Sequence, residues 1–495
     1  MGKGADGVGL LAPLIWQEDK IQPIVGAIPH EAGLVPTRRG ERKPVVAKRD
    51  VISVEELERH CTASDCWIAI EGQVYEATEW LKLHPGGDIC ILNMAGQDAT
   101  DAFRAFHKPM VSKFHLPRFH VGPLAAAAPP SKMLQEYRQL AKDLESSELF
   151  QTRPSFYLSK ALVIAALFAL VVAGVTLTSS PWVHLASGLL LGLFWQQCAF
   201  VGHDTGHLSI TRTRSLDNLI GLFVGNVCTG IGILWWKRTH NVHHIACNNV
   251  QYDPDIQHIP LFAVSEKYFA SLYSFYHKRQ MNFDRAARVL VSYQHWTFYP
   301  IMAVARWNLW AQTWILLLSG PHTPDKTAEI AALMVFYGWL ASLMSFIPSW
   351  PVRIGFLCAA VALSGILHVQ ICLSHFPMPV YDGHVATKDY VQMQLDGTMD
   401  IDCPTWLDWF HGGLQFQVEH HLFPRLPRHN LRRVKGTLRA FCKKHGLRYT
   451  SVPFWEANRL IIKCLRQHAL EARDLSKPLP PANESLLWDA LNAQG

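Results

Sequence analysis

Long apolar runs alternate with polar segments along most of this 495-residue chain. Four runs contain almost no charge and are long enough for a helix that crosses a bilayer, which needs about 20 residues. They form two pairs, and each pair is joined by a short turn that contains proline, Ser179-Ser180-Pro181 and Pro348-Ser349-Trp350-Pro351. The pattern therefore predicts two helical hairpins with spans at about 160–178, 182–201, 330–347 and 354–373.

Two further apolar segments are interrupted and predict interfacial rather than spanning helices. The segment from about Leu219 to Trp236 contains three glycines, and that from about Trp296 to Leu318 carries Arg306 and Asn308 near its centre. An even number of spans places both ends of the chain and the long central loop on one side of the membrane. The two hairpin turns hold only Arg353 among Lys and Arg, so the positive-inside rule assigns the other side, with the domains, to the cytosol.

The polar segments predict the remaining domain organisation. Residues 1–48 mix Gly, Pro and charge without periodicity and predict a mobile extension. Residues 49–122 contain short strand-like runs and predict a small folded domain, followed by a linker and pre-membrane segment at 123–155. Within that segment, the amphipathic stretch from Lys132 to Leu149 is expected to lie at the membrane surface or to lead into the first span. The membrane domain is placed at 156–450, and residues 451–495 are expected to be a cytosolic tail.

Composition supports the membrane assignment, because 49% of the residues are hydrophobic and only 17% are charged. The charge is uneven: from Asp50 to His107 there are eleven acidic residues against three basic ones. An acidic domain suits docking to a basic protein partner, although simple solubility explains the charge equally well. Basic residues flank the apolar runs instead of forming a stripe with aromatic residues, which argues against nucleic-acid binding. The eleven cysteines show no paired spacing, and the N-terminus lacks a signal-peptide pattern.

Three polar clusters carry histidines at helical spacing. Residues three and four apart share one face of a helix, so each cluster presents its side chains together. A lone histidine is usually a satisfied core or surface residue, but three such clusters on the same predicted side of the membrane indicate a metal site. Imidazole ligands alone suit iron, copper, zinc or nickel. The clusters are His203 with His207, His240 with His243 and His244, and Gln417 with His420 and His421.

A fourth histidine motif lies in the N-terminal domain. His84 opens the turn His84-Pro85-Gly86-Gly87, and His107 follows the polar segment Asp101 to Phe106. Two histidines on opposing elements can occupy both axial positions of a haem, and glycines permit close backbone approach. The alternative is a Pro-Gly turn that happens to begin with histidine. A one-electron carrier fused to the metal domain would favour a redox metal over zinc.

Residues 50–121 resemble a cytochrome b5 domain, through Trp67, Val74-Tyr75, His84 to Asp88, Gly96 to Phe103 and His107. The resemblance implies an α+β haem domain that holds haem b between His84 and His107. It also implies NADH-cytochrome b5 reductase as the electron donor.

From about Phe156 to Leu447 the chain resembles the membrane-bound fatty acyl desaturases, and the b5 fusion with the glutamine in the third box resembles the front-end group. The resemblance implies an all-α membrane domain with a cytosolic metal-binding cap and two non-haem iron ions. It also implies a further ligand near the end of the fourth span, where His375 stands and His368 and His411 compete. Gln417 would bind iron, orient a water or hydrogen-bond a neighbour. The implied ligands are His203, His207, His240, His243, His244, His375, Gln417, His420 and His421.

The resulting hypothesis is a lipid desaturase that uses O2 and electrons from its own haem domain to introduce a double bond into a polyunsaturated fatty acyl chain. A sphingolipid long-chain base is the alternative substrate, and a lipid hydroxylase or a membrane-tethered haem electron carrier are the alternative functions. Nearby polar side chains are expected to hydrogen-bond to the ligand imidazoles and fix their tautomers. The endoplasmic reticulum is the expected membrane, with a plastid membrane as the alternative. The side chains expected to orient the ligands are Asp204, Asn241, Asp253, Asp255 and Glu419.

Overall fold

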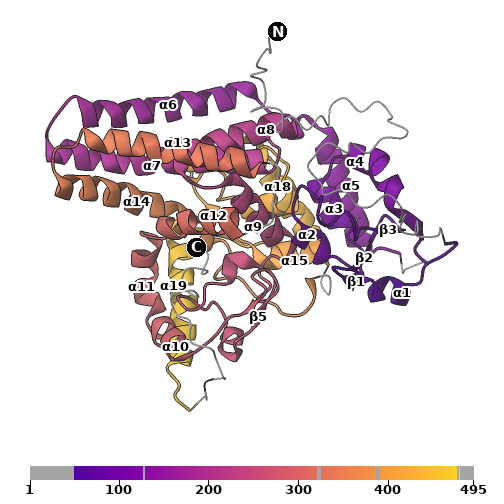
Figure 1. Cartoon of the computed structure of the whole chain (residues 1–495). Coiled ribbons are helices and arrows are strands. Elements are labelled where there is room, and N and C mark those ends of the chain that lie inside the picture. Colours follow the sequence, from indigo (N-terminus) through magenta and orange to yellow (C-terminus); the bar gives the residue numbers. More distant parts are fainter. Residues whose placement is uncertain (1–48, 126–128, 320–324, 386–388, 477–478, 480–495) are drawn as a thin grey trace, which may run out of the picture.

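The computed structural model describes residues 49–125, 129–319, 325–385, 389–476 and 479. The extension predicted for residues 1–48 lies outside the described residues. Figure 1 shows four long helices that project from one side of the molecule and the N-terminal domain on the opposite side, with shorter helices between them.

The N-terminal domain contains a four-stranded antiparallel sheet with the order β1-β2-β3-β4. Strands β2 and β3 pair with Trp67 opposite Glu76 and Ile70 opposite Gln73. The two-residue turn between them, Glu71-Gly72, has positive φ at both positions, which matches the twist of an antiparallel hairpin. The elements are α1 (Val54–Arg59), β1 (Cys61–Thr62), β2 (Asp65–Ile70), β3 (Gln73–Glu76), α2 (Asp88–Leu92), α3 (Thr100–Phe106), α4 (Pro109–Phe114) and β4 (His120–Pro123).

The four predicted spans are confirmed as long apolar helices. They are α6 (Pro154–Thr176), α7 (Pro181–Gly206), α13 (Lys326–Ser345) and α14 (Trp350–Leu373), each long and apolar enough to cross a membrane. Proline stands in the first turn of α6, α7 and α14, where its missing N–H group costs no helical hydrogen bond. Leu158 and Leu162 of α6 are 63% exposed, as expected for side chains that face lipid.

Helices α7 and α14 approach closely through two glycines one helical turn apart. A Cβ atom added to Gly188 would lie 2.4 Å from the carbonyl oxygen of Phe356, and one added to Gly192 would lie 2.5 Å from that of Ala360. Small residues at this spacing let two helix backbones touch in a membrane. The contact holds together the two helices of which α7 carries His203 and α14 ends just before His375.

Each of the two predicted interfacial segments is divided into shorter helices. The first forms α8 (Arg214–Gly221), a π-helical stretch at Leu222–Val227 and α9 (Ile233–Ile245), and the second forms α11 (Gln294–Met302) and α12 (Arg306–Ser319). The Arg306 guanidinium stacks over Trp195 at 4.1 Å and donates to the carbonyl of Thr229 at 2.6 Å. This arginine is buried inside the protein, which explains how an apolar segment tolerates it.

Helix α5 (Lys132–Ser146) is the amphipathic stretch predicted before the first span. Its buried Tyr137 and Leu144 pack against Leu438 of α18 (Arg428–His445) and the hydrophobic cluster around it. The helix packs on α18 and leads into α6 through a short 3₁₀ turn at Glu148–Phe150, which is the second of the two expected placements.

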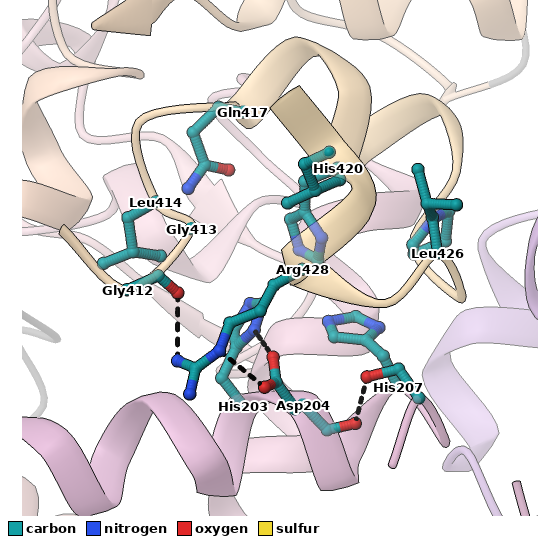
Figure 2. Close-up of a pocket in the computed structure, with 13 residues that line it drawn as sticks. His203, Asp204, His207, Gly412, Gly413, Leu414, Gln417, His420, Leu426 and Arg428 are labelled. Atoms are coloured by element: carbon teal, nitrogen blue, oxygen red, sulfur yellow. Dashed lines mark hydrogen bonds and ion pairs between the residues drawn. The ribbon is translucent and has the colours of Figure 1, made fainter. Parts of the chain in front are cut away.

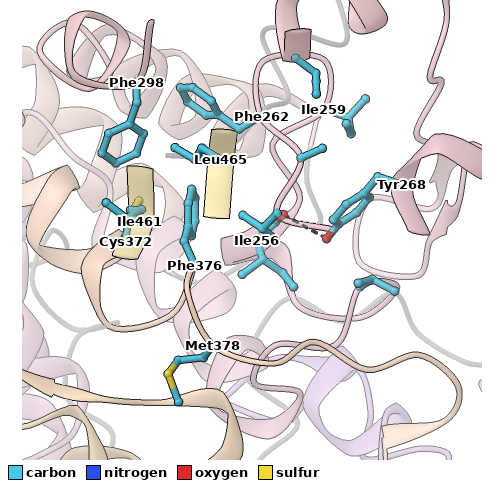
Figure 3. Close-up of a cluster of buried hydrophobic side chains, with 14 of the residues drawn as sticks. Ile256, Ile259, Phe262, Tyr268, Phe298, Cys372, Phe376, Met378, Ile461 and Leu465 are labelled. Carbon is cyan, nitrogen blue, oxygen red and sulfur yellow. Dashed lines mark hydrogen bonds between the residues drawn. The ribbon is translucent and has the colours of Figure 1, made fainter. Parts of the chain in front are cut away.

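The segment after residue 450, expected from the sequence to be a tail, begins with a strand and a packed helix. Residues Phe454–Ala472 form α19, which packs beside α10 (Arg285–Ser292) and α11 in a hydrophobic cluster (Figure 3). Ile461 and Leu465 recur at helical spacing and are fully buried there against Phe298 and Phe376. The short elements near the metal site are α15 (Tyr390–Gly397), β7 (Asp400–Asp402), α16 (Asp408–His411), α17 (Gln417–Leu422) and β8 (Ser451–Pro453).

Candidate metal and haem sites

Four separate elements bring the predicted metal histidines to one place, at the C-terminal ends of α7 and α14. His203 lies in the last turn of α7 and His207 is its C-cap. α9 carries the second cluster, α17 carries the third, and His375 follows the end of α14 by two residues. Gly206 is needed between the first two ligands, because a Cβ atom there would lie 2.1 Å from the ring of Trp236.

The histidines divide into two groups, in each of which the possible ligand atoms lie within 4.8 Å of one another. The first group combines α7, α9 and α17, and the second combines α9, its C-terminal flank, the end of α14 and α17. This arrangement is what two separate metal ions would require. The first group is His203, His207, His240 and His420, and the second is His243, Cys247, His375 and His421.

His244 lies between the two groups. Its Nε2 is 3.0 Å from Nε2 of His240 in the first group, and its ring stacks on His421 of the second at a centroid distance of 4.1 Å. The ring of His207 is 4.9 Å away. His244 therefore links the two groups by contact with members of both.

Several imidazole nitrogens in this cluster are buried without a hydrogen-bond partner among the described residues. A buried polar atom of this kind is costly unless a ligand or water satisfies it. Their convergence fits a bound cation, which neutral imidazole nitrogens coordinate. The atoms are Nε2 of His203, His207, His420 and His421, and Nδ1 of His244.

In three of the histidines, Nδ1 contacts a specific partner. In metal sites such a contact fixes the tautomer and leaves Nε2 for the metal. Nδ1 of His243 lies 2.9 Å from Asp253, Nδ1 of His421 lies 2.8 Å from Oε1 of Gln394, and Nδ1 of His375 lies 3.2 Å from the carbonyl of Gly397. Asp253 is thus placed as the sequence predicts.

The other side chains expected to orient the ligands have different principal partners. Asp255 is 3.9 Å from His243, and Asp204 is 3.8 Å from His203 but pairs with Arg428 at 2.9 Å. Asn241 donates to the carbonyl of Gly86 at 3.4 Å, and Glu419 accepts a hydrogen bond from Tyr449. The hydrogen bonds of Asn241 and Glu419 therefore go to partners other than the metal histidines.

Burial determines the protonation of the cluster. It lowers the pKa of His207, His240, His244, His420 and His421 well below the usual value, which keeps these imidazoles neutral. Burial also acts on His243, but the carboxylates of Asp253 and Asp255 outweigh it and raise the pKa of His243 to about 9. Neutral imidazoles are the form that binds a metal.

Gln417 lies among the metal histidines and is almost fully buried. It lines a cavity of about 10 Å³ together with His203, His420 and Arg428, and Figure 2 shows it across this space from His203. A cavity of this size holds about one water molecule. Burial lowers the pKa of His375, and a side-chain hydrogen bond with Gln417 opposes that shift.

The two competitors of His375 lie elsewhere. His368 is held by the carbonyl of Met302 at 3.1 Å, and His411 lies 3.3 Å from Gln370 through Nδ1. Neither belongs to the groups that could hold a metal among the described residues. The geometry favours His375.

The predicted haem histidines face each other across the N-terminal domain. The ring centroids of His84 and His107 are 6.0 Å apart, which leaves room for a metal bonded to one nitrogen of each at about 2 Å. Nδ1 of His84 donates to the carbonyl of Gly87 and Nδ1 of His107 donates to that of Phe103. Both tautomers therefore leave Nε2 unprotonated and available to a haem iron.

The sequence interpretation missed three residues. Cys247 follows His240, His243 and His244 at helical spacing, a signal that was present. Gln394 bonds to His421 and donates to the carbonyl of His244 at 2.7 Å, and nothing in its sequence context marks it. Phe106 of the N-terminal domain contacts the metal histidines, and only the packing of the domains reveals this.

Comparison with known proteins agrees with the two sites. The family described as "Cytochrome b5-like Heme/Steroid binding domain" matches residues 53–125, and the family described as "Fatty acid desaturase" matches residues 180–453. "Delta(8)-fatty-acid desaturase 2" of Arabidopsis thaliana is 46% identical, over 90% of this chain and 99% of its own length.

Two further relatives are named for different activities. "Acyl-lipid (9-3)-desaturase" of Borago officinalis is 42% identical, over 90% of this chain and 98% of its own. "Delta 8-(E)-sphingolipid desaturase" of Kluyveromyces lactis is 41% identical, over 69% of this chain and 60% of its own. These matches show that the chain, with its paired histidines and its two histidine groups, belongs to the fatty acid desaturase family and carries its own cytochrome b5-like domain.

Proposed function

We propose that this protein is a front-end desaturase that uses O2 to introduce a double bond into a fatty acyl chain. The observation that carries the proposal is the pair of histidine groups with unpartnered buried nitrogens, packed directly against a domain with a haem-binding histidine pair. The overall reaction removes two hydrogen atoms from adjacent methylene groups. Together with two electrons and two protons, it reduces O2 to two molecules of water.

The proposed centre contains two iron ions. His203, His207, His240 and His420 would hold one, and His243, His375 and His421 would hold the other, with His244 between them. When bound, the iron supplies the O2 chemistry that removes hydrogen from an unactivated C–H bond, which no side chain can do as a base. The chain's own residues orient the imidazoles through Asp253 and Gln394 and exclude bulk water by burying every ligand except His203 and His240 almost completely.

Gln417 is proposed to act beside the iron as an orienting group. Its contact with His375 and its place on the water-sized cavity support hydrogen bonding to that histidine and to a water.

The haem domain is proposed to hold haem b through His84 and His107 and to receive electrons from NADH-cytochrome b5 reductase. Two of its acidic residues are already paired with residues outside the domain, Asp88 with Arg238 and Asp101 with Arg138. Reductase docking would therefore use the acidic side chains that remain exposed. These include Glu55, Glu58 and Asp98.

The substrate proposal follows the names of the relatives, because the fatty acid and acyl-lipid desaturases are more similar to this chain than the sphingolipid desaturase is. A sphingoid base is the alternative that the third relative supports. The proposed location is the endoplasmic reticulum with both domains cytosolic, supported by the excess of Lys and Arg outside the hairpin turns. A plastid membrane is the alternative location.

The test is expression in yeast supplied with polyunsaturated fatty acids, followed by mass spectrometry of total fatty acids and sphingoid bases. We expect a fatty acid two mass units lighter than its precursor, and its loss in the His420→Ala variant with unchanged haem absorbance. A new double bond found only in sphingoid bases would replace the proposed substrate. Gain of an oxygen atom would identify a hydroxylase, and haem reduction without any product or non-haem iron would identify an electron carrier.

A further inference from the structure

Helix α9 has two functional faces. His240, His243 and His244 point into the metal groups, whereas Arg238 and Asn241 point toward the N-terminal domain. Arg238 forms an ion pair with Asp88 at 2.7 Å, and Asn241 donates to the carbonyl of Gly86 in the haem-binding turn. One helix therefore contacts both candidate cofactor sites.

Other contacts make the same interface extensive. Arg138 pairs with Asp101 through two hydrogen bonds of 2.7 and 2.8 Å. Arg425 donates to the carbonyls of Arg104 and Ala105 at the end of α3. A single hydrophobic cluster includes residues of both domains, Ile89, Cys90, Met94, Ala99 and Ala102 from one and Val242, Ile245, Ala246 and Met393 from the other.

Phe106 packs against this shared cluster and directly precedes His107, the proposed haem ligand. Its ring meets the ring of His244 edge to face at 5.7 Å and lies 6.5 Å from that of His207. His107 is covalently joined to it and His244 lies between the two metal groups. Among the described residues, Phe106 is the aromatic side chain of the haem domain that contacts the metal histidines.

We propose that Phe106 is the bridging residue through which electrons cross from the haem domain to the metal centre. The Asp88–Arg238 pair holds the haem domain against α9. This inference rests on the proposed desaturase function. Each crossing oxidises the haem domain by one electron and reduces the metal centre by one electron. Two crossings supply the two electrons that one double bond requires, and the haem domain is re-reduced by a flavoprotein reductase or, in the test, by dithionite.

The principal test is Phe106→Leu, which keeps an apolar side chain at the interface but removes the ring. The full-length holoprotein is reduced with dithionite and mixed with O2 and substrate lipid, and haem reoxidation is followed by absorbance. We expect the rate to fall about tenfold or more. The haem midpoint potential and the non-haem iron content should remain as in the wild type. The matched control is Phe114→Leu, an exposed phenylalanine on α4 outside the interface, which should reoxidise normally.

Docking is measured separately, by hydrogen–deuterium exchange of the turn around Gly86 in protein without iron. Asp88→Arg should increase exchange there and slow reoxidation, and adding Arg238→Asp should reverse both effects. Phe106→Leu should leave this exchange unchanged. Slow haem reoxidation in that variant would then result from loss of the ring and not from loss of docking. If Phe106→Leu reoxidises within about twofold of wild type while the wild type desaturates lipid, the bridging role is wrong and the proposed function stands. If the wild type itself contains no non-haem iron and makes no product, the proposed function is wrong.

Discussion

His243 and Asp253 form a buried pair in which Nδ1 of the imidazole lies 2.9 and 3.0 Å from the two carboxylate oxygens. The carboxylate also accepts hydrogen bonds from the backbone N–H groups of Asn248 and Asp255. It therefore fixes both the orientation of the imidazole and the turn after α9. A contact of this kind makes the opposite nitrogen a stronger ligand.

Asp253→Asn should lower the affinity for iron by about 10- to 100-fold, because an amide cannot accept the imidazole proton as a carboxylate does. The measurement is non-haem iron per haem after dialysis against a weak chelator. Asp382→Asn, which alters an exposed ion pair with Lys267, is the control and should retain iron. Full iron content in Asp253→Asn would contradict the orienting role.

His375→Ala and His368→Ala separate the proposed ligand from its competitor. His375 belongs to the second histidine group, whereas His368 is bonded to a backbone carbonyl within the packed helices. We expect His375→Ala to lose roughly half of its non-haem iron and all desaturation, because one of two sites loses a ligand. His368→Ala should keep its iron. If His368→Ala lost iron and His375→Ala kept it, His368 would be the ligand instead.

Gln417→Ala should keep its non-haem iron but lose desaturation by about 10- to 100-fold, the size typical of an orienting contact. The physical reason is that Gln417 interacts with His375 and lines the water-sized cavity, while the neighbouring groups contain enough imidazoles to retain the metal. Iron analysis and product yield on the same preparation provide the measurement. Loss of iron would instead assign Gln417 as a ligand.

Gly192→Ala should destabilise the membrane domain, because its Cβ would lie 2.5 Å from the carbonyl of Ala360 and force α7 and α14 apart. The expected cost is about 1–3 kcal/mol, as for other overpacked sites. Thermal unfolding in detergent, read from tryptophan fluorescence, measures it. Gly338→Ala on α13 is the matched control, since a Cβ atom there meets nothing within 4 Å. Equal melting temperatures for the two variants would contradict the close contact.

Much of the architecture was predictable because its signals are local. A run of about 20 apolar residues leaves a helix as the only way to satisfy its backbone in a bilayer, and this located all four spans. Helical spacing likewise identified the three histidine clusters, since the side chains share a face before any tertiary contact forms. The amphipathic stretch at Lys132 was left with two placements because an apolar face does not specify whether lipid or protein covers it.

The sequence by itself predicted most of the residues that could bind metal and haem, and that the metal clusters come together. Only the tertiary structure decided how His203, His240 and His420 from three helices form one group, and why His375 joins the other while His368 does not. It also revealed Gln394 and Phe106, whose roles depend on residues more than twenty positions away. Such contacts arise from packing between elements that are distant in the sequence, so no periodic pattern of residues predicts them.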